Sequence, residues 1–372
     1  MIFDNIIFKN RVNLFLSTLL VALTLGLARR IHKLFANKKG RIVIISLHKL
    51  GDSVFTIPTI LNIQKHFNRP ITIVCFKESV PIYEIKCSSI DFLILNRDDF
   101  FFRKRIANLN AKEKLKLLKP EIIIDLTGEM TSTSLIYSSS AKQILGLTKK
   151  HFSPVYDKSV DIEYKKHITE QYFNVLSLLD SNLTMNYLNN EEFRYFPIKT
   201  ICVHPFAGWR AKEWSFNKFV LLSIELNKSY KVKIIIPSNQ ISHDIIHAIE
   251  QTGIEIIFTE TVEKLISAIN ECSLLICNDS GPIHIASLLS KYTFSIFGPT
   301  NPKVHKPYGL QHGYYFNKIK CSPGDNDKMC FTAGGRVGCP SNECLNLIEV
   351  KDMYIAVENF IKKLKLSIFN EN

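Results

Sequence analysis

Short apolar runs rich in β-branched residues recur along the chain, and segments with helical periodicity lie between them. In the first half these runs cover residues 42–47, 71–76, 92–95, 121–126 and 143–147. In the second half they cover residues 200–204, 231–236, 255–258, 274–277 and 293–297. Strands that alternate with helices imply parallel sheets covered on both faces. The pattern therefore predicts an α/β protein with two Rossmann-like units in tandem.

A polar, aperiodic stretch over residues 181–199 separates the two series and is typical of a linker. A length of 372 residues also fits two domains better than one ordinary core. We expect an apolar and basic segment over 1–40, domains over 41–190 and 200–349, and an amphipathic helix within the final segment 350–372. Ligands of such folds bind at the carboxyl ends of the strands, here in a cleft between the domains.

The N-terminal segment contains a nearly uninterrupted apolar run, Val12–Ala28, with basic residues before and after it. The run lacks a small-residue cleavage site, which argues against a cleaved signal peptide. Its length is at the lower limit for a membrane span, and its weak polar stripe also allows an interfacial helix. We predict a membrane anchor, with a buried first helix as the alternative. Positive charge is heavier after the run, in Arg29, Arg30 and Lys33, which places the main body on the cytoplasmic side.

The chain carries a formal net charge of +13, concentrated in basic clusters of the first half such as 103–105 and 112–119. Such clusters suit an anionic partner, although a solvated lysine-rich surface explains them equally well. None is interleaved with the aromatic residues that single-strand binding uses, so nucleic acid is not the expected partner.

The nine cysteines show no pairing framework, which favours a reducing compartment. Four of them cluster late in the chain: Cys321, Cys330, Cys339 and Cys344. Metal sites usually bring their ligands in close pairs, and the gaps between these four are more open. We expect unpaired or opportunistically paired thiols rather than a structural zinc.

The strongest local signal is the turn Asp279-Ser280-Gly281, which follows the apolar run 274–277 and opens an apolar helical segment. A strand that turns directly into a helix there presents backbone N–H groups and a hydroxyl at a helix N-terminus. This geometry can hold phosphates without a lysine. The plainer interpretation is that Asp279 or Ser280 caps the helix and Gly281 forms the turn.

Two further loops follow strands in the same way. The first is residues 47–53, after the first strand of the first unit, and the second is residues 205–214, after the first strand of the second unit. Both contain too few glycines for the dinucleotide fingerprint or the Walker pattern, which disfavours a dehydrogenase or a P-loop enzyme. Because neither an Asp-rich metal-binding pair nor a metal-ligand cluster is visible, we predict metal independence.

These loops together resemble glycosyltransferase family 9, the heptosyltransferases. Residues 279–284, followed by 297–302, resemble the C-terminal hallmark of that family, and Gly208 with Lys212 and Trp214 resembles its nucleotide-side loop. Residues 50–52 resemble its N-terminal Gly-Asp loop, and the likeness covers about residues 41–365. The resemblance implies a GT-B fold, with two Rossmann-like domains facing across a cleft. The acceptor site would lie mainly on the first domain and the nucleotide-sugar site on the second, with the apolar helix added at the N-terminus.

The resemblance also implies inverting transfer from a nucleotide-activated sugar, typically ADP-heptose, to the lipopolysaccharide core. It makes Asp52 the general base and makes Lys212 a ligand of the donor phosphates. The donor side would comprise Ala207, Gly208, Lys212, Asp279, Ser280, Gly281, Pro282 and His284, and the acceptor side His48, Lys49 and Gly51. The chemistry agrees, because such a transfer needs a base for the attacking hydroxyl and cationic or N–H groups for the leaving diphosphate. The nucleotide sugar is a substrate, so no cofactor is expected.

One departure concerns the nucleotide. Family members often carry an acidic residue after the second strand of the C-terminal domain to bind the ribose, and residues 236–240 offer none. Ser238 or Asn239 could substitute. We predict a membrane-associated glycosyltransferase on the cytoplasmic side of the inner membrane, acting on an anionic glycolipid. The alternatives are a donor such as a UDP-N-acetylhexosamine and a catalytically silent membrane-bound scaffold, against which the presence of both Asp52 and Lys212 argues.

Overall fold

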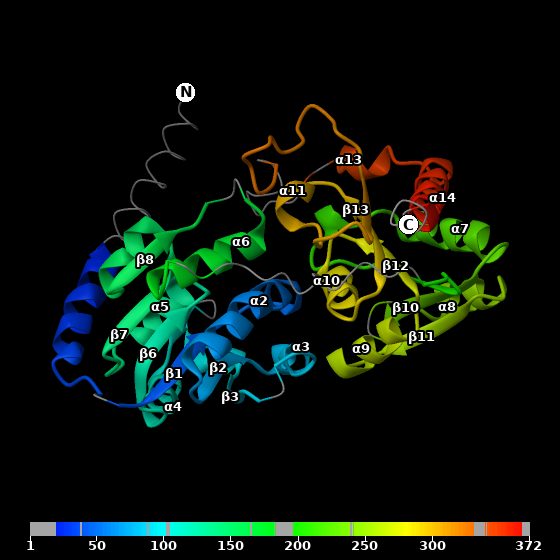
Figure 1. Ribbon diagram of the computed structural model, residues 1–372. Coiled ribbons are helices and arrows are strands. Elements are labelled where there is room, and N and C mark those ends of the chain that lie inside the picture. The colour runs from blue at the N-terminus through cyan, green and yellow to red at the C-terminus, as the bar shows by residue number, and fades with distance from the viewer. Residues whose placement is uncertain are drawn as a thin grey trace. The chain divides into compact units, whose positions relative to one another are not determined.

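The computed structural model describes residues 20–37, 39–87, 89–101, 105–163, 166–181, 183, 196–238, 240, 242–330, 339 and 341–366. Contacts within the chain divide it into two compact units, each built on one six-stranded sheet (Figure 1). The first unit comprises Met1–Lys49, Thr56–Glu163 and Thr169–Asn186. The second comprises Leu50–Phe55, Tyr164–Ile168 and Tyr187–Asn372.

The sheet of the first unit is parallel throughout, in the order β3-β2-β1-β6-β7-β8. Its strands are β1 (Arg41–Ile45), β2 (Ile71–Phe76), β3 (Asp91–Leu95), β6 (Pro120–Asp125), β7 (Gln143–Thr148) and β8 (Lys158–Asp161). A short antiparallel pair, β4 (Phe100–Phe101) and β5 (Ile106–Ala107), is separate from it. The apolar runs predicted the first five strands. They did not predict β8, because this edge strand is only four residues long and half-exposed, with polar residues at most positions.

The sheet of the second unit is also parallel, in the order β11-β10-β9-β12-β13-β14. Its strands are β9 (Thr200–His204), β10 (Lys231–Pro237), β11 (Glu255–Thr259), β12 (Leu274–Asn278), β13 (Tyr292–Phe297) and β14 (His312–Phe316). Again the edge strand β14 was not predicted. Both sheets have the strand order of a dinucleotide-binding fold, so the predicted α/β class with two Rossmann-like domains is confirmed.

The helices lie between the strands. In the first unit they are α2 (Leu50–Phe67), α3 (Val80–Glu84), α4 (Leu109–Leu117), α5 (Met130–Ile136) and α6 (Ile168–Phe173). In the second they are α7 (Phe216–Asn227), α8 (His243–Glu250), α9 (Val262–Asn270), α10 (Gly281–Leu288), α11 (Pro302–His305), α13 (Glu343–Asn346) and α14 (Val350–Leu366). The first six residues of α2, Leu50–Phe55, belong to the second unit.

The central strands are buried on both faces, which explains why they are nearly continuous apolar runs rather than alternating ones. The core of the second unit includes the buried side of α14, with Met353, Val357 and Ile361. The last helix is therefore part of this unit. The indole of Trp214 is also in this core, and its Nε1 donates to the carbonyl of Ile348 at 3.0 Å.

A helix over residues 20–33 precedes β1. It contains the second part of the predicted apolar run, and residues 12–19 lie outside the described part of the chain. Among the helices that the structure describes, none is long and apolar enough to cross a membrane. Ala22 belongs to the core of the first unit, whereas most other apolar side chains of this helix are exposed.

Candidate active site

Three neighbouring strands of the second unit end beside one another. In the sheet order β9-β12-β13, loop 205–214 follows β9, Asp279 follows β12 and loop 298–301 follows β13. The carboxyl ends of parallel strands meet at one edge of the sheet, where ligands of such folds bind. The sequence-predicted donor loops are thus brought together within one unit.

A buried carboxylate connects the three loops. The ammonium of Lys212 lies 2.6 Å from Oδ2 of Asp279, and the hydroxyl of Thr300 donates to the same oxygen at 2.6 Å. Burial alone would raise the pKa of Asp279, but the positive charge of Lys212 and its hydrogen bond outweigh that effect and lower the pKa below its usual range. Asp279 is therefore ionised and holds Lys212 in place.

The side chain of Asn278 fixes the ends of loop 205–214. Its Oδ1 accepts from the backbone N–H of Trp214 at 2.9 Å, and its Nδ2 donates to the carbonyl of Pro205 at 2.7 Å. Asn278 is fully buried, so both hydrogen bonds are shielded from water. Sequence reasoning did not single out Asn278, although one signal was available: it is the only polar residue in the apolar strand β12.

The remaining part of that loop is more open. The backbone N–H of Ala207 donates to Oε1 of Glu213 at 3.0 Å, and a side chain added at Gly208 would meet nothing within 4 Å. The ammonium of Lys212 also lies 5.4 Å from the ring centre of Trp209, a cation–π distance. Lys212 is consequently restrained from two sides.

Helix α10 begins at Gly281, and Ser280 occupies its N-cap position without a side-chain cap. The Ser280 hydroxyl donates to the carbonyl of Asn278 at 3.2 Å instead. Ser280 therefore occupies the N-cap position that the plainer interpretation allowed, but its side chain does not cap the helix. Pro282 has no N–H and that of Ile283 donates to the carbonyl of Ser280 at 3.2 Å, so the N–H of Gly281 is the one at the start of α10 that lies at the positive end of the dipole without an acceptor inside the helix. This end of α10 can accordingly receive an anion.

Two buried histidines flank the Asp279 network. Burial lowers the pKa of His284 and of His305 to about 4, so both are neutral near pH 7. Nδ1 of His305 lies 3.3 Å from the carbonyl of Asn301, whereas Nδ1 of His284 is buried without a hydrogen-bond partner in the described structure. Sequence reasoning missed His305, which lies in the short helix α11.

Asp52 lies in the first turn of α2, at its third residue. The N-cap position is Lys49, so Asp52 does not cap the helix. The ring of Phe55 is 4.3 Å from that of His284, and a side chain at Gly51 would approach Cδ2 of His284 to 3.1 Å. The negative charge of Asp52 is close enough to act on the pKa of both His284 and His305, in each case raising it against burial.

The three residues predicted to bind the acceptor do not all belong to the same unit. His48 belongs to the first unit, where its Nε2 lies 3.1 Å from the carbonyl of Leu126 and its ring contacts that of Tyr172 edge-on. Lys49 is exposed at the start of α2, and Gly51 lies beside His284 in the second unit. An acceptor-binding role for these three residues stays a prediction.

The carboxylate of Glu260 lies beside Ser238. It follows the strand adjacent to the one after which an acidic residue was expected. The backbone N–H of Ser238 donates to the carbonyl of Thr259 at 3.2 Å, and its side chain hydrogen-bonds to Glu260. Glu260 also pairs with Lys264 at 2.5 Å. It follows β11 rather than β10, so a search confined to residues 236–240 could not find it, and Asn239 lies outside the described residues.

The four late cysteines line one cavity. Gly298, Pro299 and Ile319 share its wall with Cys321, Cys330, Cys339 and Cys344. All four thiols are free, as expected, and burial followed by the neighbouring thiols raises the pKa of Cys344 to about 11. No group of three His, Cys, Asp or Glu side chains within the described ranges is placed to hold a metal ion. Sequence spacing did not reveal that these cysteines converge.

Comparison with known proteins identifies one family. The model of glycosyltransferase family 9 (heptosyltransferase) matches residues 109–331. The chain is 24% identical over 289 residues to lipooligosaccharide heptosyltransferase 2 of Campylobacter jejuni, covering 74% of this chain and 87% of that protein. The crystal structure of a family 9 glycosyl transferase from Veillonella parvula aligns with a TM-score of 0.68 and 20% identity, over 88% of this chain and 99% of that one. The E. coli heptosyltransferase WaaC, solved with ADP-2-deoxy-2-fluoro heptose, aligns with a TM-score of 0.62 and 14% identity, over 87% and 99%.

Proposed function

The chain belongs to glycosyltransferase family 9 and is a glycosyltransferase; from this we propose that it transfers heptose from ADP-heptose, with inversion, to the core of a lipopolysaccharide or lipooligosaccharide. The names of its relatives support both substrates, since one is a lipooligosaccharide heptosyltransferase and another was solved with an ADP-heptose analogue. The excess of positive charge after residues 12–28 supports a position at the cytoplasmic face of the inner membrane.

The observation that carries this proposal is the fixed position of Lys212 at the ends of β9 and β12. Its ammonium is anchored by Asp279 at 2.6 Å, yet its side chain keeps 15% of its surface exposed, so it can also reach a ligand. A cation held before the reaction stabilises the charge that develops on the leaving diphosphate. The N-terminus of α10 adds the positive end of its helix dipole and the N–H of Gly281. In this scheme Lys212 and α10 stabilise the leaving group.

Asp52 supplies the base. As a carboxylate it accepts the proton of the attacking hydroxyl while the anomeric carbon gains cationic character. His284 and His305 are neutral near pH 7, so neither forms an ion pair with Asp52, and its carboxylate stays available to the substrate. Asp52→Asn should lower kcat by about 10²–10⁴ and leave ADP affinity within twofold. A variant that keeps substantial turnover would remove Asp52 from this role.

Ser238 and Glu260 are the residues we propose for the nucleotide ribose. Both follow paired residues at the ends of β10 and β11, where Pro237 is opposite Thr259. A carboxylate accepts hydrogen bonds from the ribose hydroxyls, as in other nucleotide sites of this architecture. Glu260→Gln should weaken ADP binding by about tenfold, and an unchanged affinity would exclude the assignment.

The donor is tested by thermal unfolding with ADP, UDP and GDP, because a ligand that binds only the folded state stabilises it by mass action. At a concentration of 100 Kd the gain is about 2.7 kcal/mol. We expect a shift with ADP alone, followed by turnover of ADP-heptose in a panel of nucleotide sugars. A shift with UDP would favour a UDP-N-acetylhexosamine donor. No shift with any of the three would contradict the enzyme assignment and favour the silent scaffold.

A further inference from the structure

The helix over residues 20–33, with the turn after it, carries a stripe of exposed apolar side chains. Its members are Leu20, Leu23, Leu27, Ile31, Leu34 and Phe35, which are between 48% and 81% exposed. Successive members are one, three or four residues apart, so those within the helix share one face. Isolated exposed leucines are ordinary, but six exposed apolar side chains on a helix and the turn after it form an apolar patch that needs an explanation.

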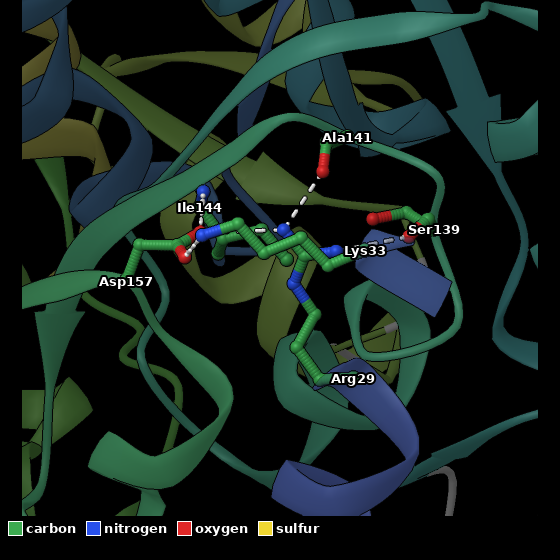
Figure 2. Close-up of polar contacts among 6 residues, drawn as sticks. All are labelled: Arg29, Lys33, Ser139, Ala141, Ile144 and Asp157. Carbon is green, nitrogen blue, oxygen red and sulfur yellow. Dashed lines mark hydrogen bonds and ion pairs between the residues drawn. The ribbon is translucent and has the colours of Figure 1, made fainter. Parts of the chain in front are cut away.

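The opposite face of this helix is fixed to the first unit by Arg29 (Figure 2). The guanidinium donates to the carbonyls of Ser139 and Ala141 at 3.3 and 2.7 Å and pairs with Asp157 at 3.2 Å. Lys33 pairs with the other carboxylate oxygen of Asp157. Asp157 also accepts from the backbone N–H of Ile144 at 2.8 Å, which ties the clamp to strand β7.

Close packing adds to the clamp. A side chain at Gly26 would approach Cβ and the carbonyl oxygen of Pro154 to 2.7 and 2.9 Å, so only glycine fits there. Beyond the helix, Asn37 donates from its backbone to Ser140 and from its side chain to Pro120, at 2.9 and 3.1 Å. The helix is thus held at several points along its length and cannot rotate its stripe inward without breaking them.

The charge pattern around the stripe favours an anionic partner. Residues 20–39 contain no aspartate or glutamate, and Arg30 and Lys39 are exposed. Residues 12–19, directly before the stripe in the sequence, are mostly apolar as well. The hydroxyl of Thr24, a polar group on this side, donates to the carbonyl of Leu20 at 2.9 Å and is therefore satisfied without water.

We propose that the stripe docks on an anionic lipid bilayer, with the helix lying in the plane of the interface. Apolar side chains would enter the boundary between headgroups and acyl chains, while the basic residues contact anionic headgroups. A position across the bilayer does not fit residues 20–33, because Arg29 is buried in protein and the clamp occupies one whole side of the helix. The first unit would then rest on the membrane that holds its acceptor.

The test is flotation of the full chain with phosphatidylcholine vesicles that contain 30% phosphatidylglycerol, without donor or acceptor. The variant Leu23→Gln/Leu27→Gln/Ile31→Gln should lower the bound-to-free ratio at least tenfold. The matched control replaces three equally exposed leucines of the second unit, Leu221, Leu310 and Leu347, by glutamine and should change the ratio less than twofold. Arg30→Gln/Lys39→Gln should lower it several-fold on anionic vesicles and leave it unchanged on pure phosphatidylcholine.

Depth distinguishes an in-plane helix from other arrangements. Tryptophan placed singly at positions 20, 27 and 31 should be quenched equally by lipids brominated near the headgroup, after subtraction of the wild-type signal. A depth gradient along these positions would contradict the in-plane geometry. The proposal would be overturned if the stripe variant bound vesicles as well as the wild type does. It would also be overturned if light scattering without lipid showed that the stripe holds two copies of the chain together. Because no sugar nucleotide is present, either result is independent of the ADP thermal shift.

Discussion

Each unit contains a buried ion pair between a basic side chain and an aspartate, and the two pairs have different roles. In the first unit the side chain of Arg29 is 4% exposed, and its guanidinium is hydrogen-bonded to two carbonyls as well as to Asp157. In the second unit Asp279 is the buried partner, at 3%, and Lys212 keeps 15% of its side chain exposed. Arg29 is thus occupied by the protein, whereas Lys212 is held by one carboxylate and retains capacity for a ligand. A cation that is buried and surrounded by protein acceptors stabilises a fold, and one that is only anchored can serve a reaction.

Arg29→Met should have the largest effect on stability. Removing the guanidinium takes a donor from the buried carbonyls of Ser139 and Ala141, at about 1–3 kcal/mol for each group left unsatisfied, whereas Asp157 keeps Lys33 as a partner. Urea unfolding of the variant should show this loss, while kcat of the folded fraction stays close to wild type. The matched control is Lys33→Met, which removes the half-exposed partner of the same Asp157 and should cost less than about 1 kcal/mol. Equal losses in the two variants would contradict the structural role of Arg29.

Lys212→Met should show the opposite balance. Loss of one electrostatic stabiliser of the transition state lowers kcat by about 10²–10³, and steady-state kinetics with ADP-heptose measure this. Lys228→Met, which removes an exposed lysine paired with Glu225 in the same unit, is the control and should leave kcat unchanged. A Lys212 variant that loses stability but keeps its turnover would contradict the catalytic role, because Lys212 would then stabilise the fold as Arg29 does.

Thr300→Val should have a smaller effect, in the same direction as Lys212→Met. The lost hydrogen bond to the carboxylate of Asp279 is worth about 1.5–3 kcal/mol, because its acceptor is charged and buried. Since Thr300 and Lys212 share Oδ2 of Asp279, the two substitutions should not be additive. A double-mutant cycle on kcat/KM measures the coupling, and strict additivity would show that Asp279 does not transmit the effect.

The sequence predicted the parts of this site better than the bonds between them. Apolar periodicity located the strands that bear the loops, turn chemistry pointed to Asp279, and the family resemblance pointed to Lys212. Their pairing spans 67 residues, and the contacts of Asn278 and Thr300 are also long-range, so local patterns contain no trace of them. Edge strands β8 and β14 escaped because they lack a continuous apolar run. Arg29 was interpreted only as a basic flank of the apolar run, because its partner Asp157 is 128 residues away and leaves no local trace.

The two units should also respond to acid differently, and this effect is the most gradual. Five buried histidines of the second unit have a pKa lowered by burial, to about 3 for His167 and His312 and to about 4 for His204, His284 and His305. Between pH 6.5 and 4 the unfolded chain binds protons that the folded unit does not, so stability falls as the pH falls. The loss approaches about 1.4 kcal/mol per pH unit for each histidine.

Asp125 of the first unit acts in the opposite sense. Burial raises the pKa of its carboxyl to about 6, against hydrogen bonds from Tyr156 and from two backbone N–H groups. The stability that this carboxyl contributes is fully present below about pH 4 and is lost as the pH rises through 6. Both tryptophans, Trp209 and Trp214, belong to the second unit, so their fluorescence during urea unfolding reports that unit. From pH 6.5 to 4.5 the tryptophan midpoint should fall more steeply than the far-ultraviolet circular dichroism midpoint, which reports both units. If both unfolding midpoints fell equally with pH, the predicted difference between the units would be contradicted.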